Sequence, residues 1–226
     1  MKILVYGAGV LGCNLARNLL RAGKDVTLLA RENWAAEIKR NGLRIKDKFS
    51  LYTSVSRIPV VTELAPDAKS NKQLIGRIFH GTKYKVVYEP NMEDYLLCHA
   101  AFVMPAAFAC YKADGDLKKL RGDTAYLNRL LDANIEGYRA IRDAGHTILP
   151  KEDADFESEK YRKTCLRFFK LMCATSLGKL CASDHAMNAI DEMSALNRDL
   201  KKFFDEHGAA YPVWQALEAE AGRYLR

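Results

Sequence analysis

The stretch MKILVYGAGVLGCNLARNLLRAGKDVTLLARENW, residues 1–34, decides the fold of the N-terminal part of the chain. Its pattern predicts an apolar strand at residues 3–6, a helix at about residues 9–22 and a second buried strand at residues 26–30. Gly23 falls where helices commonly end. A strand, a glycine-rich turn, a helix and a parallel strand in this order predict a Rossmann-type α/β domain.

The turn between the first strand and the helix carries three glycines. Gly7, Gly9 and Gly12 have the G-x-G-x-x-G spacing. Gly7 permits the tight turn, Gly9 lets the backbone approach a pyrophosphate, and Gly12 lets the helix pack closely on the strand. The N–H groups of Val10 and Leu11 would add phosphate donors at the helix N-terminus. A merely structural turn can share this spacing, but the strand and helix around it are the context of dinucleotide binding.

The residue at the end of the second strand chooses between cofactors. NAD-binding sites usually carry Asp or Glu there, to hold the ribose 2′-OH. Arg31 occupies this place, and a guanidinium suits the 2′-phosphate of NADP because it can donate two charge-assisted hydrogen bonds. The alternative is a solvent-facing Arg31 beside Glu32, which could still accept NAD. We expect NADP(H) as the cofactor.

Beyond residue 34 the pattern predicts two domains, a partial Rossmann-type NADP-binding domain at residues 1–83 and an all-α domain at residues 84–226. The remaining N-terminal elements are expected to be a helix at 33–41, a hairpin or edge strands at 43–45 and 49–55, a linker at 66–73 and a strand at 84–89. The expected helices of the second domain are 92–113, kinked by Pro105, and 117–144, 156–182, 184–207 and 212–225.

Composition excludes several classes of protein. Hydrophobic residues make up 49% of the 226, enough for a real core. No apolar run reaches the ~18 residues of a membrane span, and the N-terminus has no signal-peptide pattern, so we expect a cytoplasmic protein without membrane contact. The six cysteines form no C-x-x-C pair, which favours buried free thiols over a metal site. The net charge of +7 is scattered, which favours anionic small molecules over nucleic acid.

Longer segments point to a family. KILVYGAGVLGCNLARNLLRAGKDVTLLAR (2–31) followed by NGLRI (41–45) resembles the ketopantoate reductase (2-dehydropantoate 2-reductase) family. NMEDYLLCHAAFVMPAAFACYKADGD (91–116) and AIDEMSALNRDLKKFFDEHGAAYPVWQAL (189–217) resemble its helical domain, of the 6-phosphogluconate dehydrogenase C-terminal class. The resemblance covers about residues 1–63 and 84–220. It implies NADPH-dependent reduction of a 2-oxo acid to a 2-hydroxy acid, as in pantothenate biosynthesis, and a homodimer.

The chain departs from this family in its middle. After the hairpin the family continues with further strands and helices, whereas TELAPDAKSNK (62–72) leads almost directly to the segment before the helical domain. Either a deletion or a stretch omitted from the sequence explains this. The Rossmann-type domain is therefore expected to be incomplete, with one edge of the first strand open. We expect residues 84–89 to dock at that edge, and we expect association into a homodimer.

The second departure concerns the catalytic lysine. The resemblance places Tyr95 at the family's aromatic position, Leu97 at its lysine position and Ala101 at its asparagine position. Leucine cannot donate a proton. His99 faces another way, because two residues turn a helix by ~200°, and we interpret it as a core or interface histidine. Lys112 is a weak substitute.

Glu192 falls where the family keeps its substrate-facing acid, and it is the one candidate catalytic residue. Asp191 is adjacent and points elsewhere, so the two are no acid/base pair. His185 precedes Glu192 by about two helical turns, so a structural contact between them is as plausible as a substrate role. A solvated helix face is the alternative for Glu192.

Three functions stay open on the sequence alone. The first is an NADPH-dependent oxidoreductase of the ketopantoate reductase type. The second is a non-catalytic, nucleotide-binding or dimer-forming member that has lost the lysine. The third is a Rossmann protein with an unrelated substrate, such as an imine or a sugar derivative.

Overall fold

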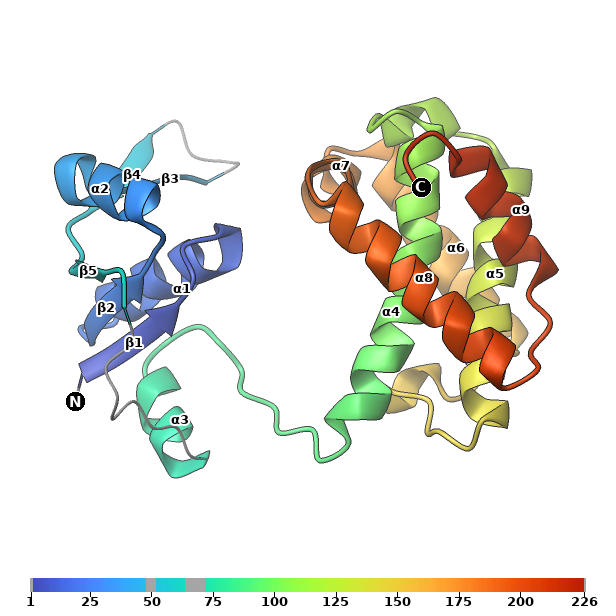
Figure 1. Ribbon diagram of the computed structural model, residues 1–226, viewed down its shortest axis with the longest axis horizontal. Coiled ribbons are helices and arrows are strands. Elements are labelled where there is room, and N and C mark those ends of the chain that lie inside the picture. The colour runs from blue at the N-terminus through green and yellow to red at the C-terminus, as the bar shows by residue number, and fades with distance from the viewer. Residues whose placement is uncertain (1, 48–51, 64–71, 226) are drawn as a thin grey trace. The chain divides into compact units, whose positions relative to one another are not determined.

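The computed structural model describes residues 2–47, 52–63 and 72–225 (Figure 1). The chain divides into two compact units, residues 1–88 and residues 89–226. The first is the α/β unit and the second is all-α, which confirms the predicted fold class. The sequence-based boundary, between residues 83 and 84, falls slightly earlier.

A small parallel sheet forms the centre of the α/β unit. Its strands are β1 (Lys2–Tyr6), β2 (Asp25–Leu29) and β5 (Val60–Val61), in the order β1-β2-β5. Helix α1 (Val10–Arg21) connects β1 to β2. Alternate apolar side chains of the two long strands are buried against α1, as the sequence pattern predicts.

A two-stranded antiparallel sheet follows helix α2 (Glu32–Asn41). It pairs β3 (Leu43–Lys46) with β4 (Thr53–Ser56) as a hairpin, one of the two predicted arrangements; residues 49–51 of the predicted second strand lie outside the described residues. Arg17 of α1 holds this hairpin: its two terminal nitrogens bind the Asp47 carboxylate at 2.8 and 2.9 Å, and one also donates to Ser54 Oγ at 3.2 Å. The Arg17 hydrogen bonds lower the pKa of Asp47. The hairpin is therefore fixed to α1 through an arginine that is only 2% exposed.

The strand predicted at residues 84–89 is wrong, because the segment is irregular. It follows helix α3 (Lys72–Phe79), which the sequence analysis missed; most of the predicted linker lies outside the described residues. The Tyr84 hydroxyl accepts a hydrogen bond from Asn18 Nδ2 of α1 at 2.8 Å, and the Tyr84 ring packs edge-on against Phe79. These contacts hold the segment on α1, and in the described part of the chain β1 pairs with β2 alone.

The second unit is a bundle of helices around α4 (Met92–Lys112), which contains Pro105 (Figure 1). Its other elements are α5 (Thr124–Asp143), α6 (Glu159–Ala174), α7 (Asp184–Asn188), α8 (Ile190–Glu206), α9 (Pro212–Ala221), two 3-10 turns (Leu117–Leu120 and Lys151–Asp153) and a π-helical turn (Lys179–Ser183). Three predicted helices are thus each divided in two. The apolar periodicity continues across these breaks, so the sequence pattern does not reveal them. At Ala189, for example, the backbone has φ −124° and ψ 39°, which is not helical and separates α7 from α8.

Within the described residues, α4 is the one helix long and apolar enough to cross a membrane by length and composition. The sequence analysis expected no such segment. Its most apolar window has a mean hydropathy of 1.2, and 61% of that window is buried inside the unit. The core helix of a soluble protein passes the same test, and α4 packs against α5, α8 and α9.

All six cysteines are free. Four are buried, as predicted, while Cys13 is half-buried and Cys181 is exposed. Burial raises the pKa of the Cys110 thiol to about 11, which keeps it protonated. In the portion of the chain that the structure describes, no group of three or more His, Cys, Asp and Glu side chains could hold a metal ion.

Aromatic rings and one carboxylate join the helices of the bundle. Trp214 of α9 is fully buried and meets Phe108 and Phe204 edge-on, with ring centroids 5.5 and 5.2 Å apart. Glu136 of α5 caps α9: its carboxylate accepts the N–H groups of Val213 at 3.0 Å and Trp214 at 2.9 Å. A buried side chain from another helix thus satisfies two donors that α9 cannot pair itself.

Replacing this cap should destabilise the bundle. In Glu136→Ala two helix N–H groups lose their acceptor in a buried position, so we expect the free energy of unfolding to fall by about 1–3 kcal/mol. Urea denaturation followed by circular dichroism measures this. Glu159→Ala, on the exposed first turn of α6, is the control and should change stability by less than about 0.5 kcal/mol. Equal stabilities for the two variants would contradict the capping role.

Candidate dinucleotide-binding site

The glycine turn has the conformation that its sequence predicts. Gly7 follows β1 with φ +100°, a backbone region that favours glycine, and its N–H donates to Leu29 O at 3.1 Å. Gly9 is the N-cap of α1 and supplies no capping side chain. Val10 and Leu11 follow and are both 86% exposed. The first N–H groups of α1 therefore face open space with no intrahelical partner, which suits an anion.

Gly9 and Gly12 are required for different reasons. A Cβ built on Gly12 would lie 1.9 Å from Gly7 O, so no side chain fits there without movement of the backbone. A Cβ built on Gly9 meets nothing within 4 Å. Gly12 thus secures the close packing of α1 on the turn. At Gly9 the space beside the backbone is open, so that a phosphate could come close to it. A methyl group at this position would fill that space, which is why glycine is expected where a dinucleotide's pyrophosphate binds.

Arg31 lies at the same edge of the sheet as the glycine turn. Strands β1 and β2 are parallel, with Tyr6 opposite Leu29, so their carboxyl ends are adjacent. Arg31 is the N-cap of α2 and is exposed. Its carbonyl oxygen accepts a hydrogen bond from Ala35 N at 2.8 Å, but in the described ranges its guanidinium forms no hydrogen bond or ion pair, and neither does the carboxylate of the exposed Glu32 beside it. A free guanidinium beside a phosphate cradle fits a dinucleotide that carries a further phosphate.

The charge of the chain favours an anion at this unit. Residues 1–88 contain sixteen Lys and Arg against six Asp and Glu, whereas residues 89–226 contain nineteen against twenty-two. The α/β unit therefore carries all of the chain's net positive charge. Such a field attracts phosphate-bearing ligands and raises their rate of association.

Comparison with known proteins agrees with this site. Residues 3–85, nearly all of the α/β unit, match the family model of ketopantoate reductase PanE/ApbA. The match to this family model thus covers the glycine turn, Arg31 and the hairpin, and it does not extend into the helical unit. No curated protein sequence matches the chain.

Two solved structures resemble the whole chain. One is a PanE/ApbA family ketopantoate reductase from Ralstonia eutropha JMP134, with 14% identity, a TM-score of 0.67, and coverage of 99% of this chain and 98% of that one. The other is D-mandelate dehydrogenase in a ternary structure with NADH and anilino(oxo)acetate, with 10% identity, a TM-score of 0.64 and the same coverage. At these identities the likeness shows the fold.

In the helical unit, the residue that the family resemblance places at the lysine position offers no proton donor. Leu97 is half-buried and packs against the core of the bundle. His99 is exposed, so it is not a core histidine, and the alternative of an interface histidine stays a prediction; its ring stacks on Tyr95 with an interplanar angle of 3°. Lys112 forms an ion pair with Glu220 at 2.6 Å and so serves the packing of α4 on α9.

The ionised group nearest to Leu97 in sequence is Asp94, which the sequence analysis did not single out. It is buried, with His146 Nδ1 at 2.7 Å from one oxygen and Thr147 N at 2.8 Å from the other. The hydrogen bond with His146, and then the one from Thr147, lower the pKa of Asp94. The Asn91–Asp94 spacing at the start of α4 is a helix-capping pattern that could have predicted it. Its contacts join α4 to the loop after α5 and leave it no catalytic freedom.

Glu192 lies exposed on the first turn of α8. The predicted shared face with His185 does not exist, since His185 belongs to α7 and the helix is broken at Ala189. A cavity of about 470 Å³ beside this turn is lined by Asp191 instead of Glu192, with Ile190, Ser194, Ala195, Arg198, Arg223 and Tyr224. A substrate role for Glu192 stays a prediction.

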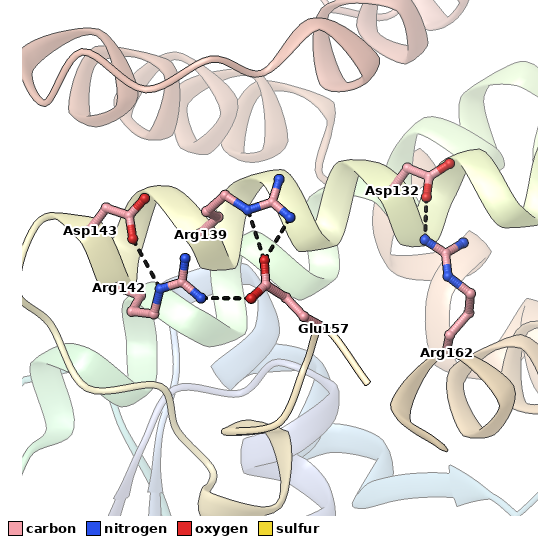
Figure 2. A network of polar contacts seen from close by, with 6 residues as sticks. All are labelled: Asp132, Arg139, Arg142, Asp143, Glu157 and Arg162. Carbon is pink, nitrogen blue, oxygen red and sulfur yellow. Dashed lines mark hydrogen bonds and ion pairs between the residues drawn. The ribbon is translucent and has the colours of Figure 1, made fainter. Parts of the chain in front are cut away.

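A cluster of charged residues between α5 and α6 has a structural role (Figure 2). The Glu157 carboxylate receives Arg139 at 2.7 and 2.9 Å and Arg142 at 2.9 Å, while Arg162 pairs with Asp132. Each guanidinium drawn in Figure 2 already has a carboxylate partner. The cluster therefore joins the segment before α6 to α5 and offers no free cation to a ligand.

The two glycine environments give a matched pair of variants. Gly12→Ala must displace the turn, so we expect a loss of about 1–3 kcal/mol of stability together with loss of cofactor binding. Gly9→Ala should leave the melting temperature unchanged, because its methyl group meets nothing and its φ of −75° suits alanine. It should still weaken NADPH binding about tenfold or more, measured by calorimetry. Unchanged NADPH affinity in Gly9→Ala would show that no phosphate approaches this turn.

Proposed function

We propose that the protein is an NADP(H)-dependent oxidoreductase of the ketopantoate reductase type, which reduces a 2-oxo acid to a 2-hydroxy acid. The observation that carries this proposal is the open glycine cradle of α1 beside the free Arg31, in a unit that matches the family model. The similarity in fold to D-mandelate dehydrogenase, whose structure contains NADH, agrees with a nicotinamide cofactor.

The residues of the α/β unit fit such a cofactor. The N–H groups at the start of α1, from Val10 and Leu11 onward, would hold the pyrophosphate, and Gly9 leaves room for it. Arg31 would bind the 2′-phosphate that distinguishes NADP from NAD. When bound, NADPH supplies a hydride to a carbonyl carbon. The chain would have to orient the 2-oxo acid and supply a proton to the carbonyl oxygen.

Leu97 favours a second candidate function. With a half-buried leucine at the family's lysine position, the helical unit lacks the expected proton donor. A non-catalytic member that binds the dinucleotide would keep the cradle and Arg31 and lose only the chemistry. Cofactor binding is common to both candidates, and turnover separates them. The choice of 2-oxo acid, homodimer formation and a cytoplasmic location stay predictions.

Cofactor preference should depend on Arg31. One or two charge-assisted hydrogen bonds are worth about 1.5–3 kcal/mol each, so we expect NADPH to bind at least about tenfold more tightly than NADH. Arg31→Ala should remove most of this preference and leave NADH affinity nearly unchanged, as measured by calorimetry. Equal affinities of the unaltered protein for the two cofactors would refute the NADP assignment.

Turnover should be weak because of Leu97. A positioned general acid contributes about 10²–10⁴-fold, so an oxidoreductase with Leu97 should oxidise NADPH with ketopantoate or other 2-oxo acids more slowly by about this factor, and the non-catalytic member should not oxidise it at all. Leu97→Lys should raise the rate if the cofactor and substrate are otherwise well placed. Leu96→Lys, on the exposed neighbouring position, is the control and should have no effect.

A gain in Leu97→Lys alone would support the oxidoreductase, and no gain would support the non-catalytic member. Robust turnover by the unaltered protein would show that another group donates the proton.

A further inference from the structure

Trp34 lies on the first turn of α2 and is 58% exposed. The other tryptophan of the chain, Trp214, is fully buried in the helical unit. In the described residues Trp34 takes part in no ring contact or hydrogen bond. An indole is among the largest apolar side chains, and leaving more than half of it in water forgoes much of its burial energy.

Trp34 belongs to a group of exposed apolar residues at one edge of the sheet. The others are Tyr6 at the end of β1, which is 74% exposed, Val10 and Leu11 at the start of α1, and Val61 at the end of β5. All five positions follow or end parallel strands at their carboxyl ends. In open α/β sheets this is the edge that binds ligands, and exposed apolar patches commonly mark a ligand groove.

The helix geometry brings Trp34 near Arg31. Arg31 is the N-cap of α2 and Trp34 is the third residue of the helix, so both belong to the same end of α2. Ala35 and Ile38 are buried and define the side of α2 that faces the core, which leaves Trp34 on its flank. Helical side chains lean toward the N-terminus of their helix, so the indole covers the end of α2 that Arg31 caps.

We propose that Trp34 stacks on the adenine base of the bound dinucleotide, so that Arg31 and Trp34 together recognise adenosine 2′-phosphate. This inference rests on the proposed cofactor binding and adds a residue to it. A flat aromatic ring beside Arg31 supplies the apolar face that a purine requires, and aromatic stacking is tolerant of exact geometry.

The two tryptophans make the test direct. The probe is 2′,5′-ADP, which contains the adenine and the 2′-phosphate and no nicotinamide, so catalysis is not involved. We expect 2′,5′-ADP to quench the tryptophan fluorescence of the full chain and to bind to it in calorimetry. Trp34→Ala should weaken binding about tenfold, while Trp34→Phe, which keeps an aromatic face, should stay within about threefold.

Fluorescence and a control variant separate stacking from other effects. In Trp34→Phe the remaining emission comes from Trp214, which is buried in the other unit, so 2′,5′-ADP should no longer quench it. Lys39→Ala, in the last turn of α2, is the control and should bind as the unaltered protein does. Because Trp34 is exposed, its variants should keep the melting temperature of the unaltered protein.

The outcomes distinguish this inference from the function on which it rests. If 2′,5′-ADP binds, and binding depends on Arg31 but is equal in Trp34→Ala, stacking is refuted and NADP binding stands. If 2′,5′-ADP does not bind the unaltered protein at all, both are refuted. If Trp34→Ala weakens binding while Trp34→Phe and Lys39→Ala do not, and the quenching disappears in Trp34→Phe, stacking is supported.

Discussion

The close approach of Gly12 to the carbonyl oxygen of Gly7 is the constraint on which the α/β unit depends. It leaves no room for a side chain, and it sets the start of α1 directly against the turn that leaves β1. The N-terminus of α1 therefore lies at the carboxyl edge of the sheet, where Arg31 and the exposed apolar residues also lie. The steric requirement places the helix terminus, and the parallel pairing of β2 with β1 brings Arg31 and Trp34 to the same edge.

The rest of this unit keeps that edge in place. Arg17, on the buried side of α1, binds Asp47 and Ser54 and fixes the hairpin to the helix. Tyr84 and Phe79 hold the segment after α3 on the same helix. Helix α1 is therefore fixed at its glycine turn, along its middle and near its end. A rigid frame of this kind suits a binding site, because the ligand need not order it.

The helical unit has a different character. Its core is rich in aromatic residues. Many of its charged side chains form structural contacts: Glu136 caps α9, Asp94 binds His146 in the loop after α5, and Glu157 binds two arginines. Leu97, which the sequence resemblance aligns with the family's lysine, packs against that core. The chain thus combines an open glycine turn with a helical unit in which, among the described residues, no proton donor stands at the position of Leu97.

The sequence by itself determined the elements whose signals are local. The glycine spacing, the apolar strands and the helix between them predicted β1, α1 and β2 closely, because each requires only neighbouring residues. Apolar periodicity likewise predicted the helical unit, and the strand-end position of Arg31 predicted its place beside the cradle.

Tertiary structure decided the rest. Residues 84–89 alternate like a strand, yet the contacts of Tyr84 with α1 keep them irregular. The break at Ala189 separates His185 from Glu192, and the pairing of Asp94 with His146 joins residues far apart in the chain. Such contacts join side chains that are far apart in the sequence, and the periodicity of a single segment does not specify them.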